Sequence, residues 1–388
     1  MKNLTKLILF FLPVFSVLVF VQKIQAQKKL SLNVWEEGKG NYKGYRIPAI
    51  IVTTKGTVIA FAEGRNDGGD SGDIDLLAKR STDNGKTWGN DILVWNDELN
   101  TCGNPCPVVD QETGRIWLLM TWNYGKDTEG QIIAKKSKYT RSPFVCYSDD
   151  DGITWSKPTE LSSNCKDTSW GWYATGPGIG IQMKNGKYKG RIIIPANHSY
   201  DDPNSKIRKD YPYGYGAHVL ISDDHGKSWR MSAPIRPGCN ESQVTELSDG
   251  RLLMNMRSYN GKNCRAISIS NDGGETWSLI ENDYQLVESI CQGSILNFGI
   301  IKGNPVHLFS NPAVTSGRTH LTIKISTNNC KDWQASLLID PNPSAYSCLV
   351  KLANGNIGLL YETGNKNAYE SIRFLSMNPK FLQGIIKN

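Results

Sequence analysis

Short runs of alternating apolar and polar residues recur along this chain, and five of them lead into the same kind of turn. The turns end in tryptophan and begin at Ser81, Ser148, Ser222, Ser270 and Ser326. The first four fit Ser-x-Asp-x-Gly-x-Thr/Ser-Trp, and the fifth keeps only its terminal Ser326 and Trp333. Asp bonds to its own backbone and Gly accepts positive φ, so each turn predicts a tight hairpin. The runs before them predict strands at residues 75–80, 144–147, 218–221, 265–269 and 321–325.

A second repeat is a turn glycine followed by an apolar strand. It occurs six times, beginning at Gly56, Gly114, Gly190, Gly250, Gly303 and Gly355. Another strand precedes each, and the first five continue through a third strand into the tryptophan hairpin. Each unit is therefore predicted to be a four-stranded antiparallel meander.

The sixth unit ends with a predicted strand at residues 371–377 and has no hairpin of its own. We expect the N-terminal run 29–35 to supply its missing outer strand, which would close a ring and leave no free sheet edge. The sequence thus predicts an all-β fold for residues 27–388, a single six-bladed β-propeller of four-stranded antiparallel blades whose ring is closed by the N-terminal strand.

Residues 1–26 do not belong to that repeat. Lys2 and Lys6 precede an apolar run at 7–21, and Ile24-Gln25-Ala26 fits a cleavage site. This pattern predicts an export signal, because the run is short for a membrane anchor and no stop-transfer segment follows it. We therefore expect the mature chain to be periplasmic or secreted and to have no membrane span.

Charge and cysteine content narrow the classes of function. The net charge of +7 falls to +4 without the three lysines of residues 1–26, too small an excess to indicate a nucleic-acid binder. The nine cysteines allow disulfides in an exported chain and leave at least one thiol unpaired. No cysteine pair has metal-binding spacing and there are five scattered histidines, so no metal or cofactor is expected.

The predicted topology separates two faces of the ring. The tryptophan hairpins lie on one face, where Asp83, Asp150, Asp224 and Asp272 should stabilise turns and the tryptophans should pack between sheets. The starts of first strands and the ends of second strands lie on the other face. The polar and aromatic residues predicted there are Arg46, Glu63, Arg65, the acidic loop 67–75, Glu241, Arg257, Gln292, Arg318, Tyr346 and Glu362.

Three arginines at one mouth of the ring indicate a site for an anionic group, most naturally a carboxylate. Arginine suits that role because its planar fork binds carboxylates in a bidentate manner and never loses its charge. Glu362 is placed to hold one of the guanidinium groups and to offset the repulsion among them.

Several motifs resemble one family across essentially all of residues 30–380. They are YRIP at 45–48, the tryptophan hairpins (called Asp boxes), ESQ at Glu241, CQGS at Cys291 and AYSCL at Ala345. Together they are similar to the exo-α-sialidases (neuraminidases) of the bacterial and animal type. The resemblance implies a retaining hydrolase that releases terminal α-linked sialic acid from glycoproteins, glycolipids and oligosaccharides, with no cofactor.

The resemblance also implies roles for individual residues. Arg46, Arg257 and Arg318 would hold the substrate carboxylate, Tyr346 would be the nucleophile, Glu241 its partner base, and Asp70 the general acid/base. Glu362 would support Arg46, while Arg65 and Gln292 would contact substrate. Asp70 is chosen over Asp67 and Asp73 because it lies at the family's spacing from the arginine of the YRIP segment. A mildly acidic pH optimum is expected, because Asp70 must protonate the leaving oxygen.

Other readings remain open at this point. The same residues would serve a trans-sialidase, including an intramolecular one that forms a 2,7-anhydro product. A propeller that only binds sialic acid, or a scaffold for protein contacts, would lack catalysis. The aromatic cluster of Trp170, Trp172 and Tyr173 is predicted either to line the pocket or to pack between blades. Loops 123–142 and 199–214 would form walls of the site or solvated surface.

Overall fold

A computed structural model describes residues 30–205 and 212–386. The predicted export signal at 1–26 and part of the predicted loop 199–214 lie outside the described residues. The described chain is almost entirely β-structure, with a few short helices, so the predicted all-β class is confirmed. Among these residues, no helix has both the length and the apolar character needed to cross a membrane.

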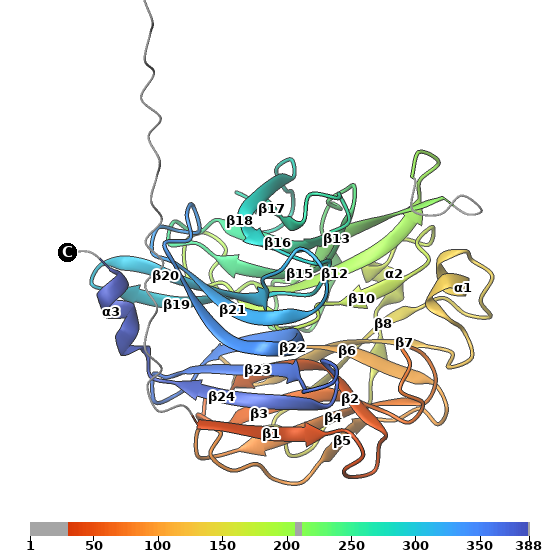
Figure 1. The fold of residues 1–388 in the computed structure, drawn as a ribbon. Coiled ribbons are helices and arrows are strands. Elements are labelled where there is room, and N and C mark those ends of the chain that lie inside the picture. The colour runs from red at the N-terminus through yellow and green to blue at the C-terminus, as the bar shows by residue number, and fades with distance from the viewer. Residues whose placement is uncertain (1–29, 206–211, 387–388) are drawn as a thin grey trace, which may run out of the picture.

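The first part of the chain forms two antiparallel meanders that share one sheet (Figure 1). The first meander contains β2 (Gly44–Val52), β3 (Val58–Arg65), β4 (Ile74–Ser81) and β5 (Ile92–Trp95). The second contains β6 (Thr101–Val109), β7 (Ile116–Asn123), β8 (Ser142–Ser148) and β9 (Thr159–Glu160). One parallel pairing, Ile74 with Thr101, joins them. The helices α1 (Glu129–Ile133) and α2 (Ser162–Cys165) lie in the connections of the second meander.

The middle of the chain forms two separate sheets. One contains β10 (Tyr173–Thr175), β11 (Ile181–Gln182), β12 (Ile192–Asp201), β13 (Tyr213–Ser222) and β14 (Arg230–Met231). The other contains β15 (Cys239–Glu246), β16 (Leu252–Ser258), β17 (Cys264–Ser270) and β18 (Glu281–Val287). All of these strand pairs are antiparallel.

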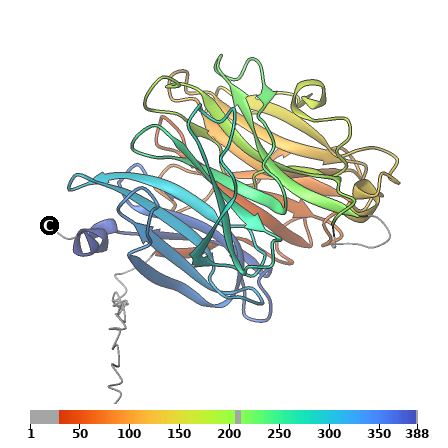
Figure 2. The ribbon, with the colours of Figure 1, turned by 90° about the horizontal axis from the view of Figure 1, so that it is seen from above.

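The last sheet contains strands from both ends of the chain. Its C-terminal strands are β19 (Ser294–Ile301), β20 (Asn304–Pro312), β21 (Thr319–Ser326), β22 (Ala335–Lys351), β23 (Ile357–Thr363) and β24 (Ser371–Met377). The first half of β22 pairs with β21 and its second half pairs with β23, so this strand serves two meanders. The N-terminal β1 (Leu30–Glu36) pairs with β24, as predicted for the run 29–35 (Figure 1). Helices η1 (Pro379–Phe381) and α3 (Leu382–Ile385) follow β24, and α3 lies at the outer side of this sheet (Figure 2).

The repeated turns have the structural role that their sequence predicts. Asp83 accepts hydrogen bonds from the Ser81 hydroxyl, from the backbone of Lys86 and from both the backbone and the hydroxyl of Thr87. Asp150, Asp224 and Asp272 bind their turns in the same way. These hydrogen bonds hold the pKa of Asp83 and Asp150 near 2, against the opposing effect of burial. The carboxylates therefore stabilise turns and are not available for acid–base chemistry.

Apolar clusters lie between neighbouring meanders. Trp88 of the first meander packs edge-on against Phe374 of β24, and Trp155 of the second packs against Phe61 of the first. Trp229 packs against Trp117 in the same manner. The predicted packing of tryptophans between sheets is confirmed. All nine cysteines lie within the described residues, and each is a buried free thiol, so the structure contains none of the disulfides that the cysteine count would allow.

Several first strands carry a β-bulge near the same end. Register shifts fall between Arg46 and Ala49 in β2, between Gly103 and Cys106 in β6, and between Ser344 and Ser347 in β22. β15 has a corresponding shift between Cys239 and Ser242. A bulge leaves a residue unpaired and re-aims its side chain. The four bulges therefore turn polar residues out of regular pairing at a common edge of the sheets.

Candidate active site

The bulged ends of the first strands line a cavity of about 320 Å³. Arg46, Asn104, Glu241 and Tyr346 reach it from four different strands, each at or beside a bulge. Ile47 also lines the cavity and has a φ of 59°, a left-handed conformation that is rare for a β-branched residue. Strain of this kind is concentrated at functional sites, because surrounding contacts must hold it in place.

The three predicted carboxylate-binding arginines meet around one tyrosine. The Arg46 and Arg318 guanidinium carbons lie 5.3 Å and 5.5 Å from the centre of the Tyr346 ring. Arg257 Nη1 donates to the Tyr346 hydroxyl at 3.1 Å. The three come from β2, from β16 and from the residue just before β21, so only the tertiary fold brings them together.

Tyr346 and Glu241 form the predicted nucleophile–base pair. The phenol hydroxyl donates to Glu241 Oε1 at 2.5 Å, and Glu241 Oε2 accepts from Arg257 Nη1 at 2.7 Å. Burial raises the pKa of Tyr346 well above its ordinary value, and the neighbouring Glu241 adds to that increase. The phenol is therefore neutral in the free protein, and the carboxylate is positioned to remove its proton.

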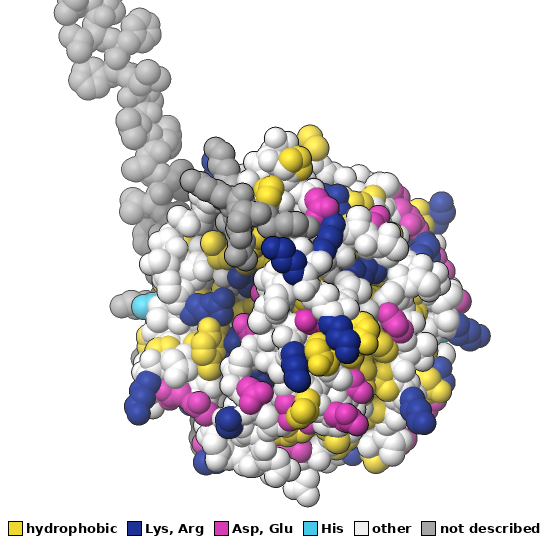
Figure 3. All heavy atoms as spheres, turned by 90° about the vertical axis from the view of Figure 1, so that its right-hand side faces the viewer, with side chains coloured by type: hydrophobic (Ala, Val, Ile, Leu, Met, Phe, Trp, Pro, Cys, Tyr) yellow, Lys and Arg dark blue, Asp and Glu magenta, His cyan; other side chains and the backbone are white. Residues whose placement is uncertain are grey.

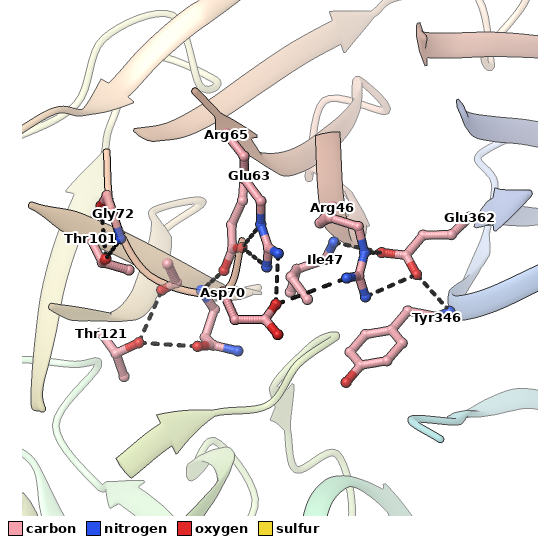
Figure 4. A network of polar contacts seen from close by, with 12 residues as sticks. Arg46, Ile47, Glu63, Arg65, Asp70, Gly72, Thr101, Thr121, Tyr346 and Glu362 are labelled. Atoms are coloured by element: carbon pink, nitrogen blue, oxygen red, sulfur yellow. Dashed lines mark hydrogen bonds and ion pairs between the residues drawn. The ribbon is translucent and has the colours of Figure 1, made fainter. Parts of the chain in front are cut away.

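Glu362 connects the arginine with the tyrosine. Its buried carboxylate accepts from Arg46 Nε at 2.7 Å, from the Ile47 backbone at 2.9 Å and from the Tyr346 backbone at 3.0 Å (Figure 4). Burial alone would lower the pKa of Arg46, but the adjacent Glu362 raises it above its ordinary value. The predicted support of Arg46 by Glu362 is present, and the same carboxylate also fixes the strained backbone at Ile47.

Replacing Glu362 with Gln should destabilise the protein by about 3 kcal/mol, the cost of breaking a buried ion pair from one side. The amide nitrogen cannot accept from Arg46 or from the Tyr346 backbone, so a buried cation loses its partner. Denaturant unfolding measures the change. Glu281→Gln on β18 is the control, since its exposed side chain should shift the free energy by less than about 0.5 kcal/mol. Equal stability of the two variants would contradict this assignment.

Asp70 lies at the exposed mouth of the cavity beside two arginines (Figure 4). Its Oδ1 accepts from Arg65 Nη1 at 2.6 Å and lies 4.0 Å from Arg46 Nη1. Arg65 is held in turn by Glu63 Oε2 at 2.9 Å from Nε. Desolvation alone would raise the pKa of Asp70, but the charge of Arg65 outweighs that effect, so the pKa of Asp70 is lowered. In the absence of substrate Asp70 is therefore ionised near neutral pH.

Gln292, predicted to contact substrate, does not line this cavity. Its side chain is 1% exposed, and its amide binds the backbone of Pro177 and Ser347. Both amide hydrogens of Gln292 donate to backbone carbonyls, and its amide oxygen accepts from the Ser347 backbone. The structure therefore gives Gln292 a supporting position beside the strand that carries Tyr346, and its contact with substrate stays a prediction.

Other cavity residues escaped the sequence analysis. They are Glu129 on α1, Arg141 just before β8, Tyr259 after β16 and Tyr369 before β24. Tyr259 and Tyr369 accept hydrogen bonds from Arg257 and Arg318 through their hydroxyls, at 2.7 Å and 3.0 Å. These residues could have been found in the sequence by searching for charged or aromatic residues next to the strand ends on the predicted functional face. Of the aromatic cluster, Trp172 lines the cavity, whereas Trp170 and Tyr173 are buried.

Arg141 and Glu129 give one side of the cavity its own electrostatic character. Arg141 is fully buried, donates to the amide oxygens of Asn104 and Asn123, and lies 4.3 Å from the Trp172 ring centre. Burial lowers its pKa to about 10. Glu129 accepts from the Tyr215 hydroxyl at 2.9 Å, and burial raises its pKa. A cation and a weakly acidic carboxyl therefore line the same cavity as Tyr346.

The cavity is suited to an anionic organic ligand. Its lining carries five arginines and four carboxylic acids, so a ligand carboxylate entering it meets an excess of cationic groups. Within residues 30–205 and 212–386, no set of three or more His, Cys, Asp or Glu side chains is arranged to hold a metal ion. On the face seen from the α1 side, basic, acidic and apolar side chains are interspersed and form no continuous basic surface (Figure 3).

Comparison with known proteins gives a consistent set of relatives. A family model described as a BNR repeat-like domain matches residues 56–359. The chain is 31% identical to a sialidase of Bacteroides fragilis, over 93% of its own length and 66% of that protein. It is 30% identical to a sialidase of Micromonospora viridifaciens, over 94% of its length and 55% of that protein. It thus spans less than two thirds of either relative.

A solved structure has a similar fold over most of the chain. The Hadza microbial sialidase Hz136 superposes with a TM-score of 0.78 at 30% identity, covering 91% of this chain and 69% of that one.

Proposed function

Because the chain belongs to the sialidase family, we propose that it is a retaining exo-α-sialidase, which hydrolyses terminal α-ketosidically linked sialic acid on glycoproteins, glycolipids and oligosaccharides. One observation carries the proposal. Three guanidinium groups from distant strands surround the Tyr346 phenol, whose hydroxyl is hydrogen-bonded to Glu241. An acidic sugar and a neutral nucleophile fit that arrangement together.

The arginines account for recognition of the sugar's carboxylate. Arg46, Arg257 and Arg318 would bind it through charge-assisted hydrogen bonds, which are stronger than neutral ones. Holding the carboxylate next to the anomeric carbon also places a negative charge beside the positive charge that develops there. The same contacts would therefore stabilise an oxocarbenium-like transition state.

Tyr346 accounts for nucleophilic attack on an anionic substrate. Most retaining glycosidases use a carboxylate, but a second full anion would repel a sugar that already carries one; sialidases with a tyrosine nucleophile are a recognised exception. The phenol of Tyr346 is neutral until Glu241 takes its proton. The new bond would then form between the phenol oxygen and the anomeric carbon, while Asp70 gives its proton to the leaving oxygen. Water, with Asp70 acting as base, would release the sugar in a second step.

We also infer that the meanders form six blades of one β-propeller closed by β1. The pairing of β1 with β24 supports closure. A buried cluster that includes Val34 of β1, Ile50 of β2, Cys348 of β22 and Phe374 of β24 supports it further, because it joins the two ends of the chain. Closure of the ring would hold β2, which carries Arg46, against β23, which carries Glu362. The geometry of the site would therefore depend on ring closure.

For the cellular context, we propose export to the periplasm or the exterior, followed by action on sialylated glycoconjugates. The support is the charged and apolar pattern of residues 1–26.

Incubating purified residues 27–388 with a fluorogenic α-sialoside tests the function, and we expect release of the fluorophore together with free sialic acid. Product analysis by mass spectrometry separates the alternatives. A 2,7-anhydro sugar would identify an intramolecular trans-sialidase, and a new sialoside in the presence of lactose would identify transfer. Binding of sialic acid without any turnover would contradict the enzyme proposal, and absence of both would contradict the site.

A further inference from the structure

Lys166 is a buried lysine whose three ammonium hydrogens are all accepted by oxygens. Its side chain belongs to a residue only 8% exposed, in the segment that follows α2. Nζ donates to the Thr140 hydroxyl, to the Arg141 carbonyl at 2.7 Å and to the Gly171 carbonyl at 3.0 Å. Within the parts of the chain that the structure describes, no carboxylate forms an ion pair with it. An ammonium that is buried without an anion is costly, so its position requires a reason.

The acceptors of Lys166 belong to two segments, each of which carries one residue of the cavity lining. Thr140 and Arg141 precede β8, whereas Gly171 precedes Trp172 in the connection to β10. The Arg141 guanidinium and the Trp172 ring lie against each other and both line the cavity. Lys166 itself does not line it. Lys166 therefore lies outside the cavity lining and connects the two backbone segments that carry Arg141 and Trp172.

The other hydrogen bonds of Arg141 and Trp172 attach these two residues to different meanders and do not connect them to each other. The Trp172 backbone is paired with Ser199 of β12, through N to Oγ at 2.8 Å and from Ser199 N to the Trp172 carbonyl at 3.0 Å. Those bonds attach Trp172 to the third meander. Arg141 binds Asn104 and Asn123 of the second meander. The Thr140 hydroxyl donates directly to the Gly171 carbonyl at 3.2 Å. The other polar connection between residues 140–141 and Gly171 is the ammonium of Lys166.

We propose that Lys166 is a positioning residue, which holds Arg141 and Trp172 together as one wall of the sialic acid cavity and thereby sets the affinity for substrate. This inference rests on the proposed function, because it assumes that the cavity binds the sugar. Lys166 acts through the pair and has no contact of its own with the reacting atoms, so its loss should affect binding and leave the chemistry at Tyr346 largely unchanged.

The charges near Lys166 agree with a role in binding an anion. Burial lowers its pKa to about 7, with a further contribution from Arg141, while Glu160 opposes the shift. Burial and neighbouring cations hold the pKa of His198 well below its ordinary value, so this imidazole is neutral and adds no second positive charge beside Lys166. Glu63 and Glu129 partly offset the charge of Arg141, and the remaining positive potential of Arg141 and Lys166 favours a carboxylate ligand in the cavity.

The test is Lys166→Met, which keeps the length of the side chain and removes its three donors. We expect KM for a fluorogenic α-sialoside to rise about 10-fold, with kcat changed less than about 3-fold; a misplacement of 1 Å in a site can cost about 100-fold. The dissociation constant of free sialic acid, measured by tryptophan fluorescence, should rise by the same factor. Lys79→Met is the matched control, since that ammonium also donates to a backbone carbonyl, Val34 O at 3.0 Å, but away from the cavity.

A double-mutant cycle with Trp172→Leu separates positioning from a general loss of stability. If Lys166 acts through the wall, Lys166→Met should add less than about 2-fold to the KM of the Trp172→Leu variant, because interacting sites are non-additive. Full additivity, or an unchanged KM in Lys166→Met, would overturn the proposal. If Lys166→Met does not fold, Thr140→Val decides the matter: it removes one acceptor, and a KM raised about 3-fold is expected, whereas an unchanged KM refutes the link. Lack of hydrolysis by the native chain would instead refute the proposed function.

Discussion

Replacing Tyr346 with Phe should lower kcat for a sialoside at least about 10⁴-fold, because removal of a catalytic nucleophile can cost up to about 10⁶-fold. The substitution deletes one oxygen, the atom that donates to Glu241 and accepts from Arg257. The ring itself, with Arg46 and Arg318 packed on it, stays in place. Binding of free sialic acid should therefore change less than about 3-fold, because the arginines that recognise the carboxylate keep their remaining partners.

Tyr369→Phe provides the matched control for this result. Its phenol also lines the cavity and accepts from an arginine of the triad, Arg318 Nη1 at 3.0 Å, but no carboxylate among the described residues is hydrogen-bonded to it. Losing that hydroxyl should cost about 10- to 100-fold in kcat/KM, the effect of one hydrogen bond to a charged group. Steady-state kinetics of both variants and a fluorescence titration with sialic acid make the comparison. Similar losses in the two variants would mean that Tyr346 is a binding residue and would remove it from the nucleophile role.

The strand pattern was predictable because the repeat is local. Each Asp-box turn needs only its own Ser, Asp, Gly and Thr to form, and the strands on either side follow from alternation. The predicted strand 371–377 coincides with β24, and the N-terminal run pairs with it as expected. Local chemistry also explains why the turn aspartates could be set aside as structural before any coordinates were known.

The convergence of site residues was predictable from topology, but their detailed placement was not. Antiparallel order puts the starts of first strands at one edge of the sheets. The sequence therefore predicted that Arg46, Glu241 and Tyr346 lie close together. The bulges that turn these side chains into the cavity depend on pairing with neighbouring strands and leave no simple sequence signature. Gln292 was predicted on the same face from the strand order. Its side chain instead forms hydrogen bonds with the buried backbone of Pro177 and Ser347, so it does not line the cavity.

Connections between strands were the least predictable part of the site. Loop 123–142 read as a polar loop, but its Thr128 and Gln131 form a capping box that starts α1 and places Glu129 in the cavity. Arg141 and Lys166 are buried cations, and burial of a charge depends on acceptors from distant segments. Sequence alone identifies neither.

Asp70→Asn should lower kcat/KM for sialyllactose about 10³-fold, within the range for loss of a general acid. Asparagine has nearly the same shape and can still accept from Arg65, but it cannot protonate a leaving oxygen. An aryl sialoside with an acidic phenol as leaving group does not need that proton, so its kcat/KM should fall less than about 10-fold. Asp67→Asn, in the same loop, is the control and should be close to native on both substrates. Equal losses on the two substrates would contradict the acid role.

The same carboxyl should determine the pH dependence of the native enzyme. Asp70 acts as an acid only when protonated, so activity is present below its pKa and is lost as pH rises through it. Arg65 lowers that pKa in the free protein, which places the alkaline limb of kcat/KM on the acidic side. A bound substrate carboxylate offsets the charge of Arg46 and its neighbours and raises the pKa, so the limb of kcat should lie at higher pH than that of kcat/KM. The Asp70→Asn variant should lose this limb for sialyllactose. A native profile that stays flat from about pH 4 to pH 8 would show that another group supplies the proton.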